Sequence, residues 1–168
     1  ENLVNEFSDF ARMPKPILEK NDLVRIIKDN IKLLSQIDPS IKIDLIFDKS
    51  SISLESDKEQ MNRVIFNLIK NSIESIQQKA ENTSNFDKII NIEIYKKNNQ
   101  ICIIIIDNGL GFGNFSDNVN EILNPYVTTK KNGTGLGLSI VNKIINDHNG
   151  RLNFFSIPNG AKVEIIFN

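Results

Sequence analysis

Several features that mark other classes of protein are scarce or missing in this sequence. It has one cysteine, Cys102, so it can form neither an internal disulfide framework nor a thiolate metal site. The 20 lysines and arginines nearly balance the 21 aspartates and glutamates, so no net field attracts an anionic bilayer or nucleic acid, and we expect no nucleic-acid partner. The longest apolar run, residues 101–106, is far too short to cross a bilayer. These absences favour a globular domain with one buried, inert thiol in a reducing compartment.

The length of 168 residues, 40% of them hydrophobic, suffices for one full core and a short appendage. The appendage comes first. Leu3, Phe7 and Phe10 share one helical stripe, and Pro14 ends the pattern because proline cannot continue the hydrogen-bond ladder. We expect residues 1–20 to be the end of a helix from a longer protein, followed by a linker, and residues 21–168 to be one domain. A short helix that starts here is the alternative.

Hydrophobic periodicity predicts the elements of that domain. Apolar residues at helical spacing predict helices over residues 22–38, 57–78 and 134–148. Apolar patterns predict strands, alternating with polar residues over residues 41–47 and continuous over residues 101–106. Further strands are predicted over residues 52–54, 89–95, 151–156 and 161–167, with hairpin turns at 96–100 and 158–160. We predict an α/β (α+β) sandwich, in which three helices cover one face of a mixed, mostly antiparallel sheet of about five strands.

Alternating glycines open the third predicted helix, in the run Gly133, Thr134, Gly135, Leu136 and Gly137. The start of a helix exposes free backbone N–H groups and the positive end of the helix dipole, and glycines let a phosphate chain approach that backbone closely. A glycine run alone is weak support, since many such turns only join a strand to a helix. Together with the residues described next, it indicates a nucleotide site.

Two asparagines, Asn67 and Asn71, lie one turn apart on the second predicted helix and project from one face. Asparagine is a poor helix former, so a stacked pair calls for a reason. Solvated or back-bonding amides are the ordinary explanation. An amide oxygen is also a hard, neutral ligand for Mg²⁺, which keeps waters and phosphate oxygens as its other ligands. The helix by itself leaves both interpretations open.

Asp107 follows the long apolar run and precedes Gly109 and Gly111. A carboxylate at this place can accept a hydrogen bond from an exocyclic amine, while the glycines admit a flat ring close to the backbone. An ordinary turn after a strand is the alternative, because Asp, Asn and Gly are typical turn residues.

Four segments together resemble the N, G1, F and G2 boxes of sensor histidine kinases, in the order that this family has. They are residues 67–72, 107–112, 124–130 and 133–138. Residues 5–14 also resemble the segment that leaves the dimerisation helices in kinases of the NtrY type, from nitrogen-regulation two-component systems. The resemblance implies the Bergerat ATP-binding fold, shared with gyrase, Hsp90 and MutL. Leu123 departs from the pattern, since many relatives have phenylalanine there.

This resemblance implies ATP and Mg²⁺ as cofactors and assigns a role to each candidate residue. Asp107 would bind the amino group of adenine, and Gly109 and Gly111 would line the base pocket. Asn71 would hold Mg²⁺, with Asn67 supporting the same site.

The phosphates have their own implied contacts. Lys70 would reach phosphate oxygens, with a solvated lysine as the alternative. Residues 113–131 would form a lid, with Tyr126 packed at its base, and the backbone amides of residues 133–137 would cradle the phosphates.

The resemblance also separates phosphoryl transfer from hydrolysis. Related hydrolytic ATPases carry a glutamate that activates water one turn before the metal asparagine, where this sequence has Asn67. An amide takes no proton at neutral pH, so we expect slow hydrolysis and an ATP that is kept for transfer. A hydrolytic ATPase or an anti-sigma-type serine kinase on the same fold is the alternative, and a degenerate interaction module is a third.

The implied enzyme is a protein-histidine kinase whose acceptor histidine lies upstream, on dimerisation helices that residues 1–20 would end. We interpret the single histidine, His148, as a helix-terminal residue favoured by the helix dipole, so autophosphorylation by this chain alone is not expected. The implied partners are those helices, in a homodimer of the full-length protein, and a response regulator. We expect a cytoplasmic domain and leave open an inner-membrane anchor elsewhere in the full-length protein.

Overall fold

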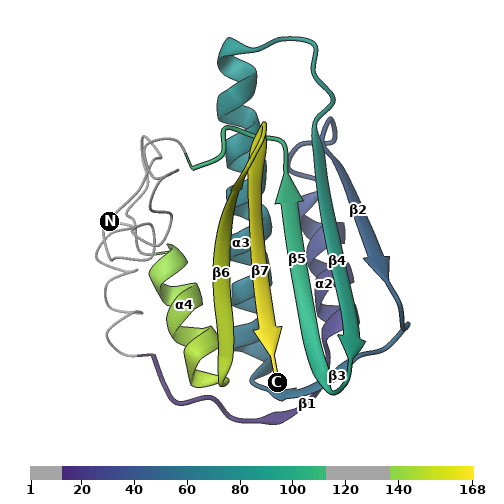
Figure 1. The fold of residues 1–168 in the computed structure, drawn as a ribbon, viewed down its shortest axis with the longest axis vertical. Helices are drawn as coiled ribbons and strands as arrows, with labels where there is room; N and C mark the ends of the chain where they lie inside the picture. The colour runs from purple at the N-terminus through teal and green to yellow at the C-terminus, as the bar shows by residue number, and fades with distance from the viewer. Residues whose placement is uncertain (1–12, 113–136) are drawn as a thin grey trace.

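The computed structural model describes residues 13–112 and 137–168, in which three helices lie on one face of a five-stranded sheet (Figure 1). The sheet has the order β2-β4-β5-β7-β6, formed by β2 (Lys42–Phe47), β4 (Ile89–Lys97), β5 (Gln100–Asp107), β7 (Gly160–Phe167) and β6 (Gly150–Ile157). β2 is parallel to β4, and every other neighbouring pair is antiparallel. The predicted sandwich with a mixed, mostly antiparallel sheet is confirmed.

The helices are α2 (Leu23–Leu34), α3 (Lys58–Asn82) and α4 (Gly137–Asp147), and α3 lies between the other two. Their apolar faces cover the core because alternate strand residues point toward them, as Ile101, Ile103 and Ile105 of β5 do. Cys102 lies on the other face of the sheet, yet it is only 6% exposed, and burial raises the pKa of its thiol. The predicted burial of this thiol is therefore confirmed. None of the described helices is long and apolar enough to span a membrane.

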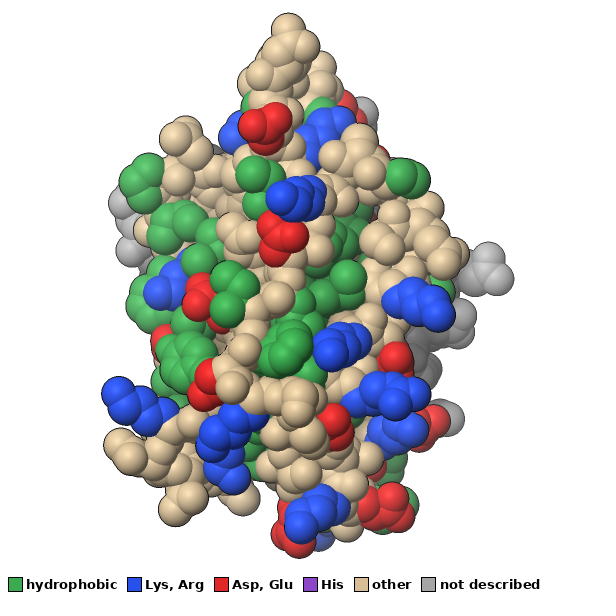
Figure 2. Space-filling model, turned by 90° about the vertical axis from the view of Figure 1, so that its right-hand side faces the viewer, with side chains coloured by type: hydrophobic (Ala, Val, Ile, Leu, Met, Phe, Trp, Pro, Cys, Tyr) green, Lys and Arg blue, Asp and Glu red, His purple; other side chains and the backbone are tan. Residues whose placement is uncertain are grey.

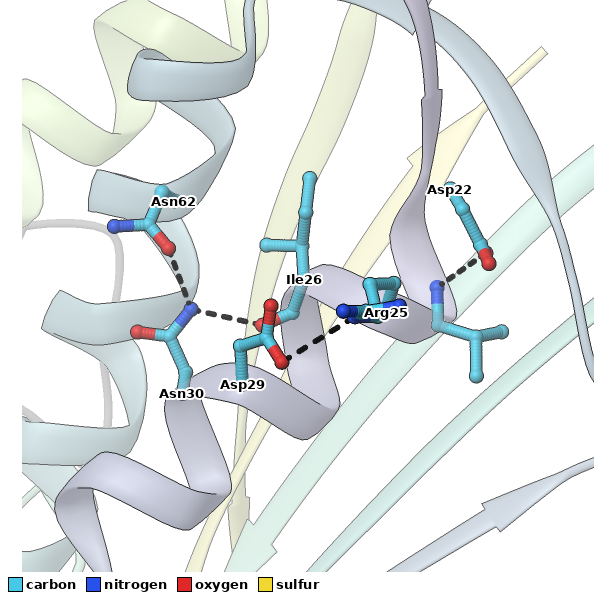
Figure 3. Close-up of polar contacts among 7 residues, drawn as sticks. Asp22, Arg25, Ile26, Asp29, Asn30 and Asn62 are labelled. Atoms are coloured by element: carbon cyan, nitrogen blue, oxygen red, sulfur yellow. Dashed lines mark hydrogen bonds and ion pairs between the residues drawn. The ribbon is translucent and has the colours of Figure 1, made fainter.

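Polar side chains fix the start of α2 and its contact with α3 (Figure 3). Asp22 caps the helix, since its Oδ1 accepts from the backbone N–H of Val24 at 3.0 Å. On the buried side, the Nδ2 of Asn30 donates to the carbonyl of Ile26 and to Oδ1 of Asn62, both at 2.9 Å. The second bond joins α2 to α3, the helix that carries the candidate site.

The structure differs from the sequence prediction in several elements. The first helix, α2, ends at Leu34, before the predicted end at residue 38. β1 (Glu19–Asp22) was not predicted, because its residues are polar; it pairs antiparallel with β3 (Ser53–Ser56), which extends the short predicted strand. The expected break after Gln78 was wrong, since α3 continues to Asn82 through residues that favour helix. The third predicted helix is described from Gly137 onward, because residues 134–136 lie outside the described part of the chain.

The β2 edge of the sheet carries apolar side chains that remain exposed. Ile46 is 59% exposed, and Nζ of Lys28 stands 4.6 Å from the ring centre of Phe47. Figure 2 faces this edge and shows apolar side chains among lysine and acidic ones. Lys42 and Asp44 lie on the same strand, and charged residues on an edge strand disfavour pairing with another sheet.

Candidate functional site

The candidate site is built around Asp107, the last residue of β5. The side chain is buried, with 6% exposed, and its Oδ1 accepts from the backbone N–H of Gly109 at 2.9 Å. Burial raises the pKa of Asp107, while hydrogen bonding from Gly109 and from Ser72 on α3, and the charge of Lys79, oppose the rise. The result is a fixed, buried acceptor at the carboxyl end of a central strand.

The turn that follows Asp107 is attached to α3 by side chains spaced along one helical face. The Oγ of Ser75 accepts from the backbone N–H of Leu110 at 2.9 Å, and Nζ of Lys79 donates to the carbonyl of Asn108 at 2.8 Å. Sequence reasoning missed Ser72, Ser75 and Lys79. Their spacing of three and four residues, which places them on one face of a helix, was the available signal.

Asn108 attaches the same turn to the start of β4. Its Oδ1 accepts from the backbone N–H of Ile89 at 3.0 Å, and its Nδ2 donates to the carbonyl of Asp87. The residue was assigned no role from the sequence. The turn is thus held on two sides, by a helix and by a strand.

The glycines around Asp107 are required by close packing. A Cβ on Gly109 would lie 2.7 Å from the carbonyl carbon of Ser75, and Gly111 has a φ of +76°. A Cβ on Gly160, in the next strand, would lie 1.9 Å from the backbone oxygen of Asp107. Sequence reasoning placed Gly160 only in a hairpin turn. The packing explains why these residues are glycines, and their contact with a base stays a prediction.

The two asparagines lie on α3, in the turns that precede Ser75. Asn67 and Asn71 are each partly exposed and one turn apart, while Lys70 is exposed with its Nζ 5.9 Å from the ring centre of Phe66. Asn71 directly precedes Ser72 on the helix. The proposed metal ligand is thus next in sequence to the α3 residue that acts on the proposed base ligand, Asp107, at the end of β5.

Part of the predicted site lies outside the described residues. This holds for Tyr126, Gly133, Thr134, Gly135 and Leu136, and for the rest of the expected lid. Gly137 is the first residue of α4, and a Cβ placed on it would meet nothing within 4 Å.

Comparison with known proteins identifies this arrangement. Residues 56–168 match the family described as histidine kinase-, DNA gyrase B- and HSP90-like ATPases. The chain belongs to this family. Nitrogen regulation protein NtrY of Azorhizobium caulinodans is 33% identical over 161 residues, which cover 94% of this chain and 20% of NtrY. The chain thus spans about a fifth of that relative.

Two solved histidine kinases have the same fold. Full-length ShkA in complex with AMPPNP superposes with a TM-score of 0.80 and 18% identity, covering 98% of this chain and 35% of ShkA. ThkA in complex with the response regulator TrrA gives a TM-score of 0.79 and 20% identity, covering 99% of this chain and 46% of ThkA. The chain is the catalytic ATP-binding domain of a sensor histidine kinase.

In this kinase domain His148 connects α4 to α3. Its Nε2 accepts from the backbone N–H of Asp57 at 3.1 Å, and its Nδ1 lies 2.7 Å from the carbonyl of Ile144. Both ring nitrogens are thus engaged, one with the start of α3 and one with α4. The structure gives the residue a packing role, which the sequence did not indicate.

Replacing His148 should therefore weaken the fold and leave nucleotide binding in place. We expect His148→Ala to lower the free energy of unfolding by about 1–3 kcal/mol, because the N–H of Asp57 loses its partner. Urea denaturation measures the loss, with Asn146→Ala, an exposed position on the same helix, as the matched control. Loss of ATP binding by folded His148→Ala would contradict this purely structural role.

Proposed function

We propose that this domain binds Mg·ATP and, within the longer protein, transfers the γ-phosphate to a histidine outside this chain. From that histidine the group would pass to an aspartate of a response regulator. The observation that carries the proposal is the buried Asp107 carboxylate, which accepts from the N–H of Gly109 and interacts with Ser72, the residue after Asn71 on α3. A fold that only needed a turn after β5 would not place a charged group there.

The base would be selected by Asp107. An ionised carboxylate accepts hydrogen bonds only, so it matches the amino group of adenine. Gly109 and Gly111 lie in the same turn and would line the space beside the base. Because the turn is held by α3 and by β4, the acceptor is already in position before a nucleotide arrives.

The residues present fit a magnesium ion bound together with the nucleotide. Among the described residues no group of three or more His, Cys, Asp or Glu could hold a metal ion by itself. A cation here would therefore take most of its ligands from phosphates and water, as Mg²⁺ usually does. Asn71 would hold the ion, supported by Asn67, and the ion would neutralise phosphate charge.

The triphosphate would extend from Asn71 toward the start of α4. Lys70 is exposed and carries a charge that phosphate oxygens attract. The amides of residues 133–137 would supply the helix-start donors, and Tyr126 would pack under the lid. The domain then contributes position and charge neutralisation, the two main factors in phosphoryl transfer.

Slow hydrolysis distinguishes this proposal from its alternatives. We expect the domain, given ATP labelled at the γ-phosphate and a separately purified pair of phosphoacceptor helices, to label a histidine of those helices. Free phosphate should appear slowly, because the amide at Asn67 cannot deprotonate water. Rapid release of phosphate would favour a hydrolytic ATPase, and phosphoserine on a partner would favour a serine kinase.

The longer protein gives this activity its context. We propose that residues 1–20 end the dimerisation helices and link them to the domain at residues 21–168, in a homodimer that acts in nitrogen regulation. Two contacts support a fixed link: the N–H of Ile17 donates to Oδ2 of Asp57 at 2.9 Å, and Nε2 of Gln60 donates to the carbonyl of Pro14 at 3.0 Å. We propose a cytoplasmic location for the domain, and an inner-membrane anchor would lie elsewhere in the protein.

A further inference from the structure

The linker that leads into the domain is attached to it from Met13 onward. Met13 packs against the hydrophobic core, and the carbonyl of Pro14 accepts from Nε2 of Gln60 at 3.0 Å. The backbone N–H of Ile17 donates to Oδ2 of Asp57 at 2.9 Å. The residues that follow form β1, which pairs with β3 (Figure 1). The linker is thus held at several successive points near the start of α3.

Asp57 is the residue at which three segments meet. It is the N-cap of α3, since its Oδ1 accepts from the backbone N–H of Gln60 at 3.1 Å. Its own N–H donates to His148 at the end of α4, and its Oδ2 holds the linker at Ile17. Capping requires one side-chain oxygen, which an asparagine would supply equally well. The second oxygen of Asp57 is therefore not needed for the helix and serves the linker.

Gln60 supports the same interpretation. The residue is only 8% exposed, and its Oε1 has no hydrogen-bond partner among the described residues. An unpartnered buried amide oxygen destabilises a fold. A methionine would fill a similar space without that loss, but it could not donate to the carbonyl of Pro14. The contact with the linker is therefore what the amide of Gln60 provides.

Two prolines stiffen the linker between these contacts. Pro14 and Pro16 fix their own φ angles, and each restricts the residue before it to extended backbone. A stiff segment that is held at both ends transmits direction, whereas a flexible one only limits distance. The side chains of Ile17 and Leu18 are 74% and 55% exposed, so burial does not attach this part of the linker. Hydrogen bonds to its backbone hold it instead.

We propose that Asp57, with Gln60, is a positioning residue for phosphoryl transfer: by holding the linker against the start of α3, it sets the direction from which the phosphoacceptor helices approach the domain. The proposal rests on the function proposed above, in which the acceptor histidine belongs to the same longer protein. Transfer within that protein depends on how often the reacting groups meet in the correct geometry, which a fixed linker favours. Transfer to separately supplied helices does not depend on the linker. Loosening the linker should therefore slow only the first reaction.

Asp57→Asn separates the two functions of the carboxylate. The amide keeps one oxygen for the N–H of Gln60, but its Nδ2 would face the N–H of Ile17, and two donors cannot bond. We expect the longer protein with this substitution to label its own histidine about fivefold more slowly, the size expected for one lost hydrogen bond. The isolated domain with the same substitution should label separately purified helices at the wild-type rate, with unchanged affinity for ADP. Gln60→Met should give the same pattern.

Asp22→Asn is the matched control. Asp22 is the N-cap of α2 and half-buried like Asp57, and a single oxygen, Oδ1, accepts from the N–H groups of Val24 and Ile52. The substitution removes the same charge from the same kind of position and leaves both bonds in place. We expect the wild-type rate in both assays, which would exclude an effect of charge alone.

The outcomes separate this inference from the proposed function. If wild-type protein labels the histidine and folded Asp57→Asn slows both assays equally, or neither, the inference about the linker is wrong and the function stands. If Asp57→Asn lacks a cooperative thermal transition, Gln60→Met decides by the same ratio of the two rates. Wild-type protein that labels no histidine in either assay would contradict the proposed function itself.

Discussion

Asp107→Asn is expected to abolish adenine nucleotide binding without weakening the fold. The substituted side chain keeps an oxygen for the N–H of Gly109 but loses the charge, and its amino group can face the amine of adenine. We expect the affinity for ATP to fall on the order of a hundredfold or more, because a site built to bond a polar group rejects a mismatch strongly. Calorimetric titration with a non-hydrolysable ATP analogue measures the loss, and Asp48→Asn, at an exposed position, is the control.

Although Asp107→Asn should weaken ATP binding, it should leave the folding stability equal to or higher than that of the wild type. Burial raises the pKa of Asp107 in the folded state, so the folded chain binds this proton more tightly than the unfolded chain. The ionised side chain therefore destabilises the fold once the pH rises through the folded pKa, and it has no such effect below the unfolded pKa. At neutral pH, Asp107→Asn should unfold at an equal or higher urea concentration. A large loss of stability would mean that Asp107 is mainly structural.

Asn71→Ala is expected to remove phosphotransfer more completely than it removes nucleotide binding. If Asn71 holds Mg²⁺ against the phosphates, its loss misplaces the charge that the reacting phosphoryl group requires. We expect the rate of transfer to separately supplied phosphoacceptor helices to fall on the order of a hundredfold. Binding of ADP without Mg²⁺ should change little, because the base contact to Asp107 is untouched.

The exposed Asn82, the last residue of α3, supplies the control for that experiment. Asn82→Ala removes the same amide from the same helix, far along from the site, and should transfer at the wild-type rate. Equal transfer rates for Asn71→Ala and wild type would exclude Asn71 as the metal ligand.

Local patterns predicted most of the fold because the strands and helices have strong periodicity. β5 is apolar throughout, so the sequence predicted a strand, but only the structure shows that Ile101, Ile103 and Ile105 face the helices. β1 could not be predicted in this way, since its polar residues form a strand only by pairing with β3. The end of α3 was missed because a polar helix surface resembles a loop in sequence.

Some residues of the candidate site could likewise be predicted from the sequence, and others could not. Asp107 and Asn71 stand in recognisable segments, and the structure brings those segments together. Ser72 and Asn108 act through contacts with residues 35 and 19 positions away along the chain, Asp107 and Ile89, which no local pattern reveals. His148 is a stronger case, because its partner Asp57 is 91 residues distant. Partners of polar side chains that lie far away along the chain can be identified only from a structure.

The most direct test is an NMR titration of the domain with AMPPNP, first with Mg²⁺ and then with paramagnetic Mn²⁺ in its place. One site that holds base and metal together predicts that the nucleotide shifts the backbone amide of Gly109, next to the base ligand, and that Mn²⁺ broadens the side-chain amide of Asn71. Both effects should saturate at the same nucleotide concentration. Shifts confined to another face of the domain, or broadening that leaves Asn71 untouched, would contradict the account.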